Sequence, residues 1–185
     1  MANVQDVAKF FIGLANDQAC SNQGDMMTHL RLQKLLYFAQ GWNLARYGKP
    51  LFDDEIEAWH YGPVVPAVYN EYKQYGRSGL AGSLPDADAF TEEEFALLLD
   101  VAREYERFGT TSLVSMTHKR GAPWDSVNGH GVIPRDAIRS YFAAQIPLTS
   151  FEDVEQFSEV YIPERDENGT PVIAAEFAEG WDDDD

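Results

Sequence analysis

The chain has 185 residues, enough for one hydrophobic core, and no run in it approaches the ~20 apolar residues that span a bilayer. Because no signal peptide is recognisable either, we expect a soluble protein of the cytoplasm. Its 31 acidic and 14 basic residues give a formal net charge of −17, which argues against autonomous binding to nucleic acid, since phosphate contacts supply most non-specific affinity.

Two helices are predicted in the first quarter of the chain. Asn3 is a suitable N-cap for the first, in which apolar residues keep helical spacing from Val4 to Ala15. The second is the central helix of the chain, from about His29 to Tyr47, with Thr28 as its N-cap and Gly48 as its C-terminal stop. It is apolar nearly all round, which is typical of a buried helix.

The residues after this helix change to the alternation of a half-buried strand, from Glu55 to Tyr61, which Gly62-Pro63 ends. A third helix is predicted to begin with Pro66 at its first position and to reach Gly76. Its side chains Tyr72 and Tyr75 are candidates either for the core or for a partly exposed protein-binding surface.

Residues 77–89 have no periodicity and contain Gly and Pro, which indicates a surface loop. Thr91 and Glu94 then match a capping box, with Phe90 and Phe95 placed as its hydrophobic staple. We expect the buried face of this helix to contain Phe95, Leu98, Leu99, Ala102 and Tyr105. Shorter helices are predicted from Thr110 or Thr111 to His118 and from Pro134 onward, separated by a loop containing Pro123-Trp124.

The last segment is distinct in charge. Residues 152–185 contain thirteen acids and one base, Arg165, for a net −12, whereas the rest of the chain carries only −5. Asn168-Gly169 lies between two short apolar runs and predicts a hairpin. We therefore expect a helical domain over residues 1–150 and an acidic extension over 151–185, with a flexible tail. That tail either captures a partner or keeps the chain soluble.

Several ordered motifs resemble the Panacea domain family: LRLQKLLYFAQGW at 30–42, GKPLF at 48–52, IEAWHYGPVVPAVY at 56–69, and shorter matches from Leu113 to Phe142. The resemblance implies a mostly helical antitoxin module of bacterial or phage toxin-antitoxin pairs that neutralises its toxin by direct binding. One relative is implied to be an adaptor that hands its toxin to the ClpXP protease. The residues that we treat as the structural motif are Leu32, Lys34, Leu35, Leu36, Trp42, Trp59, Gly62, Pro63, His118, Pro123 and Trp124.

No catalytic, cofactor-binding or metal-binding residues are predicted. The histidines lack the i,i+4 spacing of a zinc motif, and the single Cys20 excludes a site built of several thiolates. His118 is explained more simply by a hydrogen bond to a loop carbonyl than by catalysis. The sequence also lacks a nucleophile elbow and a phosphate-binding glycine loop, so we expect no enzyme.

The sequence therefore predicts a mainly α-helical domain with small β elements, and its resemblance to the Panacea family implies that this domain is an antitoxin. Two alternatives remain open: a proteolytic adaptor serving a ClpXP-type protease, and an acidic mimic of nucleic acid. The partners expected are a cognate protein toxin and, for the adaptor, a protease complex. The predicted partner-binding residues are Tyr72, Tyr75, Phe177, Trp181, Asp182, Asp183, Asp184 and Asp185.

Overall fold

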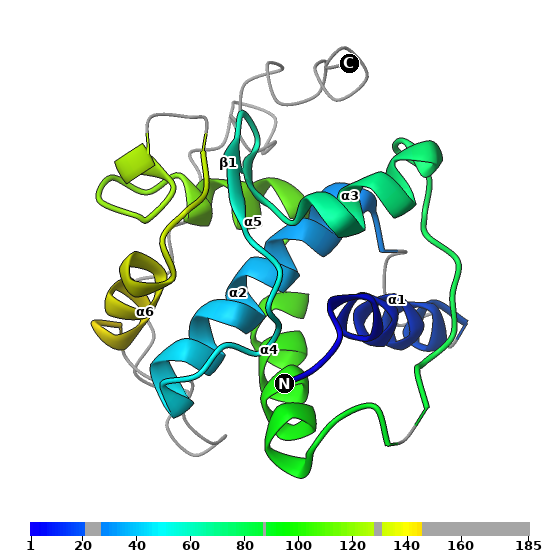
Figure 1. Cartoon of the computed structure of the whole chain (residues 1–185). Coiled ribbons are helices and arrows are strands. Elements are labelled where there is room, and N and C mark those ends of the chain that lie inside the picture. Colours follow the sequence, from blue (N-terminus) through cyan, green and yellow to red (C-terminus); the bar gives the residue numbers. More distant parts are fainter. Residues whose placement is uncertain (21–26, 87, 128–130, 146–185) are drawn as a thin grey trace.

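A computed structural model describes residues 1–20, 27–86, 88–127 and 131–145. Within these ranges the chain is mainly α-helical with a small two-stranded sheet, as the sequence predicts. Figure 1 shows α2 running through the middle of the molecule, and α2 contacts every other α-helix and the second strand. The elements are α1 (Val4–Cys20), α2 (His29–Tyr47), β1 (Glu57–Trp59), β2 (Gly62–Val64), α3 (Pro66–Tyr72), η1 (Lys73–Tyr75), α4 (Glu92–Glu106), α5 (Thr110–Thr117), η2 (Asp125–Val127) and α6 (Arg135–Ala143).

The predicted caps of α2 are confirmed. The Thr28 side chain accepts a hydrogen bond from the backbone N–H of Arg31, and Gly48 ends the helix in the left-handed conformation, with φ of 68°. Between these caps Leu32, Leu35 and Leu36 are buried in the core. The helix therefore begins and ends on local signals, while its burial comes from the elements packed around it.

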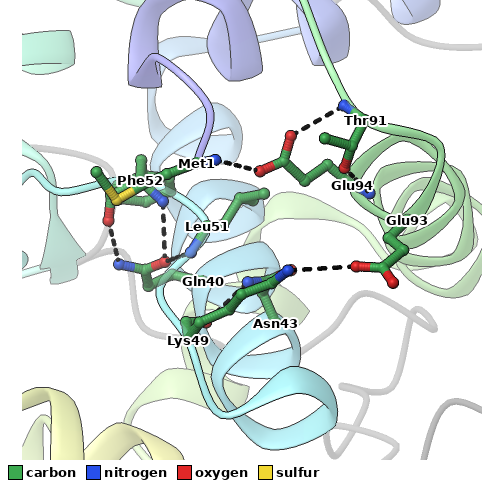
Figure 2. A network of polar contacts seen from close by, with 9 residues as sticks. All are labelled: Met1, Gln40, Asn43, Lys49, Leu51, Phe52, Thr91, Glu93 and Glu94. Atoms are coloured by element: carbon green, nitrogen blue, oxygen red, sulfur yellow. Dashed lines mark hydrogen bonds and ion pairs between the residues drawn. The ribbon is translucent and has the colours of Figure 1, made fainter.

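Polar side chains in the second half of α2 hold the loop that follows it (Figure 2). The Gln40 Oε1 accepts hydrogen bonds from the backbone N–H groups of Leu51 and Phe52, at 2.7 and 3.4 Å, and its Nε2 donates to the Phe52 carbonyl at 2.9 Å. Asn43 donates to the Lys49 carbonyl at 2.8 Å. Residues 49–52 thus obtain backbone partners from α2 side chains, since they form no regular structure of their own.

The start of α4 is joined to this region by charge. The capping box of Thr91 and Glu94 is present as predicted, and Glu94 Oε1 also pairs with the Met1 ammonium at 2.9 Å. Lys49 pairs with Glu93 at 3.2 Å, although both of these side chains are exposed. Burial is the largest single influence on the Glu94 carboxyl and acts to raise its pKa. The hydrogen bonds to Thr91 and to the Met1 ammonium together outweigh burial, so the pKa of Glu94 is lowered.

Two expectations differ from the structure. The predicted strand is shorter, Glu57–Trp59, and the residues expected to end it, Gly62-Pro63, instead begin β2, which pairs with β1 in antiparallel register. The buried face of α4 is formed by Leu97, Leu98, Val101, Ala102 and Tyr105. Phe95 lies outside that face, with 46% of its surface exposed.

The extension predicted at 151–185, including its hairpin, lies outside the described residues. In the part of the chain that is described, no helix is both long and apolar enough to cross a bilayer.

The packing of α6 against α2 at Gly41 generates the first prediction. A Cβ on Gly41 would lie 2.3 Å from Cε2 of the buried Phe142 ring. Gly41→Ala is therefore expected to destabilise the fold by about 2 kcal/mol, because the ring cannot move without opening the core. Thermal unfolding measures the loss. The control is Gly109→Ala, where a Cβ meets nothing within 4 Å; equal losses in both variants would show that the helices are not tightly packed.

Candidate functional site

The structural-motif residues that are not part of the α2 core gather around the β1–β2 hairpin. The free edge of β2 faces α2, where two adjacent side chains take the place of a third strand. Lys34 Nζ donates to the Pro63 carbonyl at 3.0 Å, and Gln33 Oε1 accepts from the Val65 N–H at 2.8 Å. Both side chains are completely buried. The edge of β2 is thereby satisfied by a helix.

The turn of the hairpin is held from the other side by α5 and the loop after it. Trp124 Nε1 donates to the Trp59 carbonyl at 2.7 Å, and His118 Nε2 lies 3.2 Å from the His60 carbonyl oxygen. The His118 and Trp124 rings are themselves in contact, with centroids 3.9 Å apart. We call the side chains of Gln33, Lys34, His118 and Trp124 the hairpin clamp.

The outer edge of β1 is covered by the segment before α6. The Ala58 N–H donates to the Gly131 carbonyl and the Ile133 N–H donates to the Ile56 carbonyl, each at 2.8 Å. The hairpin is therefore fixed on both edges and at its turn. Such a small sheet would be marginal by itself in water, so its stability depends on these contacts.

Gly62 lets the hairpin lie directly on the clamp. Its φ is 101°, a conformation that L side chains rarely adopt. A Cβ there would lie 2.7 Å from Thr117 Oγ1 and 2.9 Å from Lys34 Nζ. Thr117 is buried and its hydroxyl donates to the Val114 carbonyl at 2.7 Å. A larger residue would therefore displace groups that cannot easily move.

Burial controls the charge state of the clamp. It lowers the pKa of the Lys34 amine well below its usual range. Burial also lowers the pKa of His118, although its hydrogen bonds to the Val114 and His60 carbonyls oppose this shift. At the start of α2, burial lowers the pKa of His29 to about 4, and any proton on the nearby Lys34 amine would act in the same direction. The region therefore favours uncharged amine and imidazole groups.

These groups are poorly placed for chemistry on a dissolved substrate. Lys34 Nζ is fully buried beneath the hairpin and bonded to a backbone carbonyl. Both ring nitrogens of His118 lie near carbonyl oxygens, with Nδ1 2.8 Å from that of Val114. Among the described residues no group of three or more His, Cys, Asp or Glu is arranged to hold a metal ion. The clamp positions a hairpin and supports the surface above it.

The structure divides the predicted residues into three sets. Leu32, Leu35, Leu36 and Trp42 are core residues of α2, and Trp42 Nε1 also donates to the Tyr105 hydroxyl at 3.0 Å. Of the predicted partner-binding residues, Tyr72 is buried and Tyr75 is 38% exposed. Phe177, Trp181 and Asp182–Asp185 lie outside the described residues. The motif residues at or next to the clamp are Lys34, Trp59, Gly62, Pro63, His118, Pro123 and Trp124.

Sequence reasoning missed Gln33 and Thr117. The position of Gln33 carried a signal, because a polar side chain on a helix that is apolar all round is buried and needs a hydrogen-bonding partner. The role of Thr117 had no such signal, since its contact with Gly62 joins residues far apart in the chain.

The fold and the clamp together define a class of protein: a helical scaffold that fixes a small hairpin on a buried lysine. A model of the family described as "Antitoxin SocA-like, Panacea domain" matches residues 32–125, half of the chain. That range runs from the first turn of α2 to the start of η2 and includes every clamp residue. The chain therefore belongs to the SocA-like Panacea domain family, as its motifs predict.

One curated relative shows the extent of the similarity. The chain is 31% identical over 119 residues to "Antitoxin SocA" of Caulobacter vibrioides (strain NA1000 / CB15N), an alignment that covers 57% of this chain and 62% of that protein. The chain thus spans less than two thirds of the length of this relative. No solved structure matches the chain at a significant level.

The buried lysine generates a prediction about pH. The folded protein disfavours protonated Lys34, whereas the unfolded chain binds that proton up to about pH 10. The contribution of Lys34 to the free energy of unfolding is therefore most favourable above pH 10 and becomes less favourable as the pH falls. Relative to Lys34→Met, the wild type should gain stability between pH 7 and 9, by at most about 1.4 kcal/mol per pH unit.

Denaturant unfolding at several pH values measures this difference. The range stops at pH 9 because the raised pKa values of Tyr37 and Tyr105 act in the opposite direction once unfolded tyrosines ionise near pH 10. At pH 7 the methionine variant should be about as stable as the wild type, since it avoids burying an amine but leaves the Pro63 carbonyl without its donor. Parallel curves for the two proteins would show that the amine is charged in the fold.

A second prediction concerns Gly62. Gly62→Ala should destabilise the fold by more than about 2 kcal/mol, because backbone strain adds to the displacement of Thr117 and Lys34. Gly121→Ala is the matched control, since Gly121 also has a positive φ, 81°, but its Cβ would meet nothing within 4 Å. Only strain of about 1 kcal/mol is expected there. Equal losses in thermal unfolding would mean that the hairpin does not press on the clamp.

Proposed function

We propose that this chain is an antitoxin that neutralises a cognate protein toxin by binding it directly. The match of residues 32–125 to the SocA-like Panacea family is the observation that carries the proposal. The name of the curated relative, an antitoxin, supports it. The proposed site of action is the cytoplasm. The proposed mechanism is non-catalytic, because the buried amine of Lys34 and the neighbouring imidazole of His118 are bonded to backbone carbonyls.

The charge of the chain favours a protein partner over nucleic acid. A net charge of −17 repels phosphate and attracts a basic protein surface over long range. Electrostatic attraction of this kind raises the association rate, while a small number of apolar side chains supply the affinity. Tyr75 and the acidic end of the chain, with Phe177 and Trp181, are our proposed contributors to capture.

Co-expression with the product of the neighbouring gene tests the proposal. We expect that product to arrest the growth of a heterologous bacterium, and this chain to restore growth and co-purify with it. Leu36→Asp is the control, because it introduces an unpaired charge into the core and unfolds the domain while keeping the protein acidic. Continued arrest in the presence of folded wild-type protein would contradict the proposal, and rescue by Leu36→Asp would favour an acidic mimic.

Two further arms of the same experiment separate mechanism from binding. Rescue that requires a ClpXP-type protease, with a shortened toxin half-life, would identify an adaptor; rescue without that protease supports occlusion of the toxin. Removal of Glu179–Asp185 should leave the melting temperature nearly unchanged and slow association at low salt, with the difference shrinking as salt screens the charges. Unchanged association at low salt would assign the tail a solubilising role.

A further inference from the structure

An exposed apolar patch lies where the loop before α4 crosses α1. It consists of Leu84, Phe90 and Phe95; Leu84 is 52% exposed, Phe95 is 46% exposed and Phe90 is half-buried. The Phe10 ring of α1 lies beneath both phenylalanines, with centroids 5.7 Å from Phe95 and 6.0 Å from Phe90. We call these three residues the α4 patch.

The backbone under the patch is held in place. Asn16 Nδ2 donates to the Gly82 carbonyl at 2.9 Å, and Gly13 has no side chain between α1 and the backbone of Leu84. Figure 1 shows this loop descending past α1 toward the start of α4. Leu84 is therefore presented to solvent by a segment that is itself packed on a helix, which lowers the entropy lost when a partner binds.

The core does not require Phe95 at its position. The buried face of α4 is complete with Leu97, Leu98 and Val101, each fully buried. The other large exposed apolar side chains of the described residues, Tyr75 and Val132 among them, come from different elements. Leu84 and Phe95 both lie against α1, because the backbone of Leu84 approaches Gly13 and the ring of Phe95 contacts Phe10, three residues earlier in the helix. A contiguous apolar patch with a polar border is characteristic of an interaction surface.

The border of the patch is acidic. Residues 78–102 contain six acids and no Lys or Arg. Three of the six are paired: Glu93 with Lys49, Glu94 with the Met1 ammonium, and Asp100 with Arg46. The other three, Asp86, Asp88 and Glu92, are exposed, and none of them forms an ion pair with any described residue. Negative charge next to the apolar surface is therefore left uncompensated.

We propose that the α4 patch is the surface that docks the toxin, and that the toxin presents an apolar side chain flanked by Lys or Arg. This inference rests on the proposed antitoxin function and adds the location and the chemistry of the contact. The three unpaired acids complement a basic border on the partner. A second copy of this chain is disfavoured, because a symmetric contact through the patch would bring the same three carboxylates of both copies together.

The test uses the full chain and the neighbouring gene product, with affinity and growth rescue as readouts. Phe95→Ser should weaken binding by at least about tenfold, as for a buried aromatic anchor. Ala96→Arg adds a positive charge next to Phe95 in sequence without removing a packed side chain, since Ala96 is exposed on α4, and this charge should also weaken binding to a basic partner. Val132→Ser is the matched control, at 43% exposure, and should bind nearly as wild type.

Neutralisation of the border gives a second readout. Combining Asp86→Asn with Glu92→Gln should slow association several-fold at low salt and have little effect at high salt. Melting temperatures within a few degrees of wild type verify folding. If growth rescue and affinity are unchanged in both Phe95→Ser and Ala96→Arg, the docking role of the α4 patch is overturned and the antitoxin function still stands. If the folded wild-type protein fails to rescue growth, the antitoxin function itself is overturned, and the inference with it. If Phe95→Ser dissociates a homodimer, the patch serves self-association and the inference is also overturned.

Discussion

Side-chain hydrogen bonds from α2 to the backbone of the short segments packed around it are the interactions on which the rest of the structure depends. Gln33 and Lys34 bond to the backbone of β2 and the residue after it, while Gln40 bonds to residues 51 and 52. These three side chains are almost completely buried. Buried backbone groups need partners, and the short segments around α2 cannot form enough of them with each other. The central helix thus supplies polar contacts as well as apolar surface.

Of these three side chains, Lys34 costs the most free energy to bury, and it also selects most specifically how the hairpin lies on α2. Burying an amine costs free energy, and one bond of 3.0 Å to the Pro63 carbonyl does not compensate for full hydration of the charge. In its neutral form the amine still donates to that carbonyl. An apolar side chain of similar length fills the space without supplying a donor, so the lysine selects one position of the hairpin on α2. Gln33 fixes the adjacent residue, Val65, in the same register.

The features that the sequence predicted depend on contacts between residues close in sequence, whereas the features that it did not predict depend on contacts between distant residues. Local signals predicted the ends of α2 and the capping box of Thr91 and Glu94, because each cap bonds within one helical turn. The second strand was missed because Pro63 is usually a strand breaker, and its carbonyl finds a partner 29 residues away in Lys34. Phe95 was expected in the core because a staple is a local pattern, whereas the buried face of α4 is set by packing against α2.

The same separation applies to function. The clamp residues gather at one end of α2, under the hairpin, and their contacts run from α2 to α5 and the loop after it. The α4 patch comes from the loop before α4 and the first turn of α4, rests on Phe10 of α1, and includes no residue of the clamp. Substitutions in the patch therefore alter an outer surface and leave the buried hydrogen bonds intact. Under the proposed docking role of the patch, one scaffold can keep its hairpin and lysine unchanged while the apolar side chains at 84, 90 and 95 and the acids beside them change to suit a different partner.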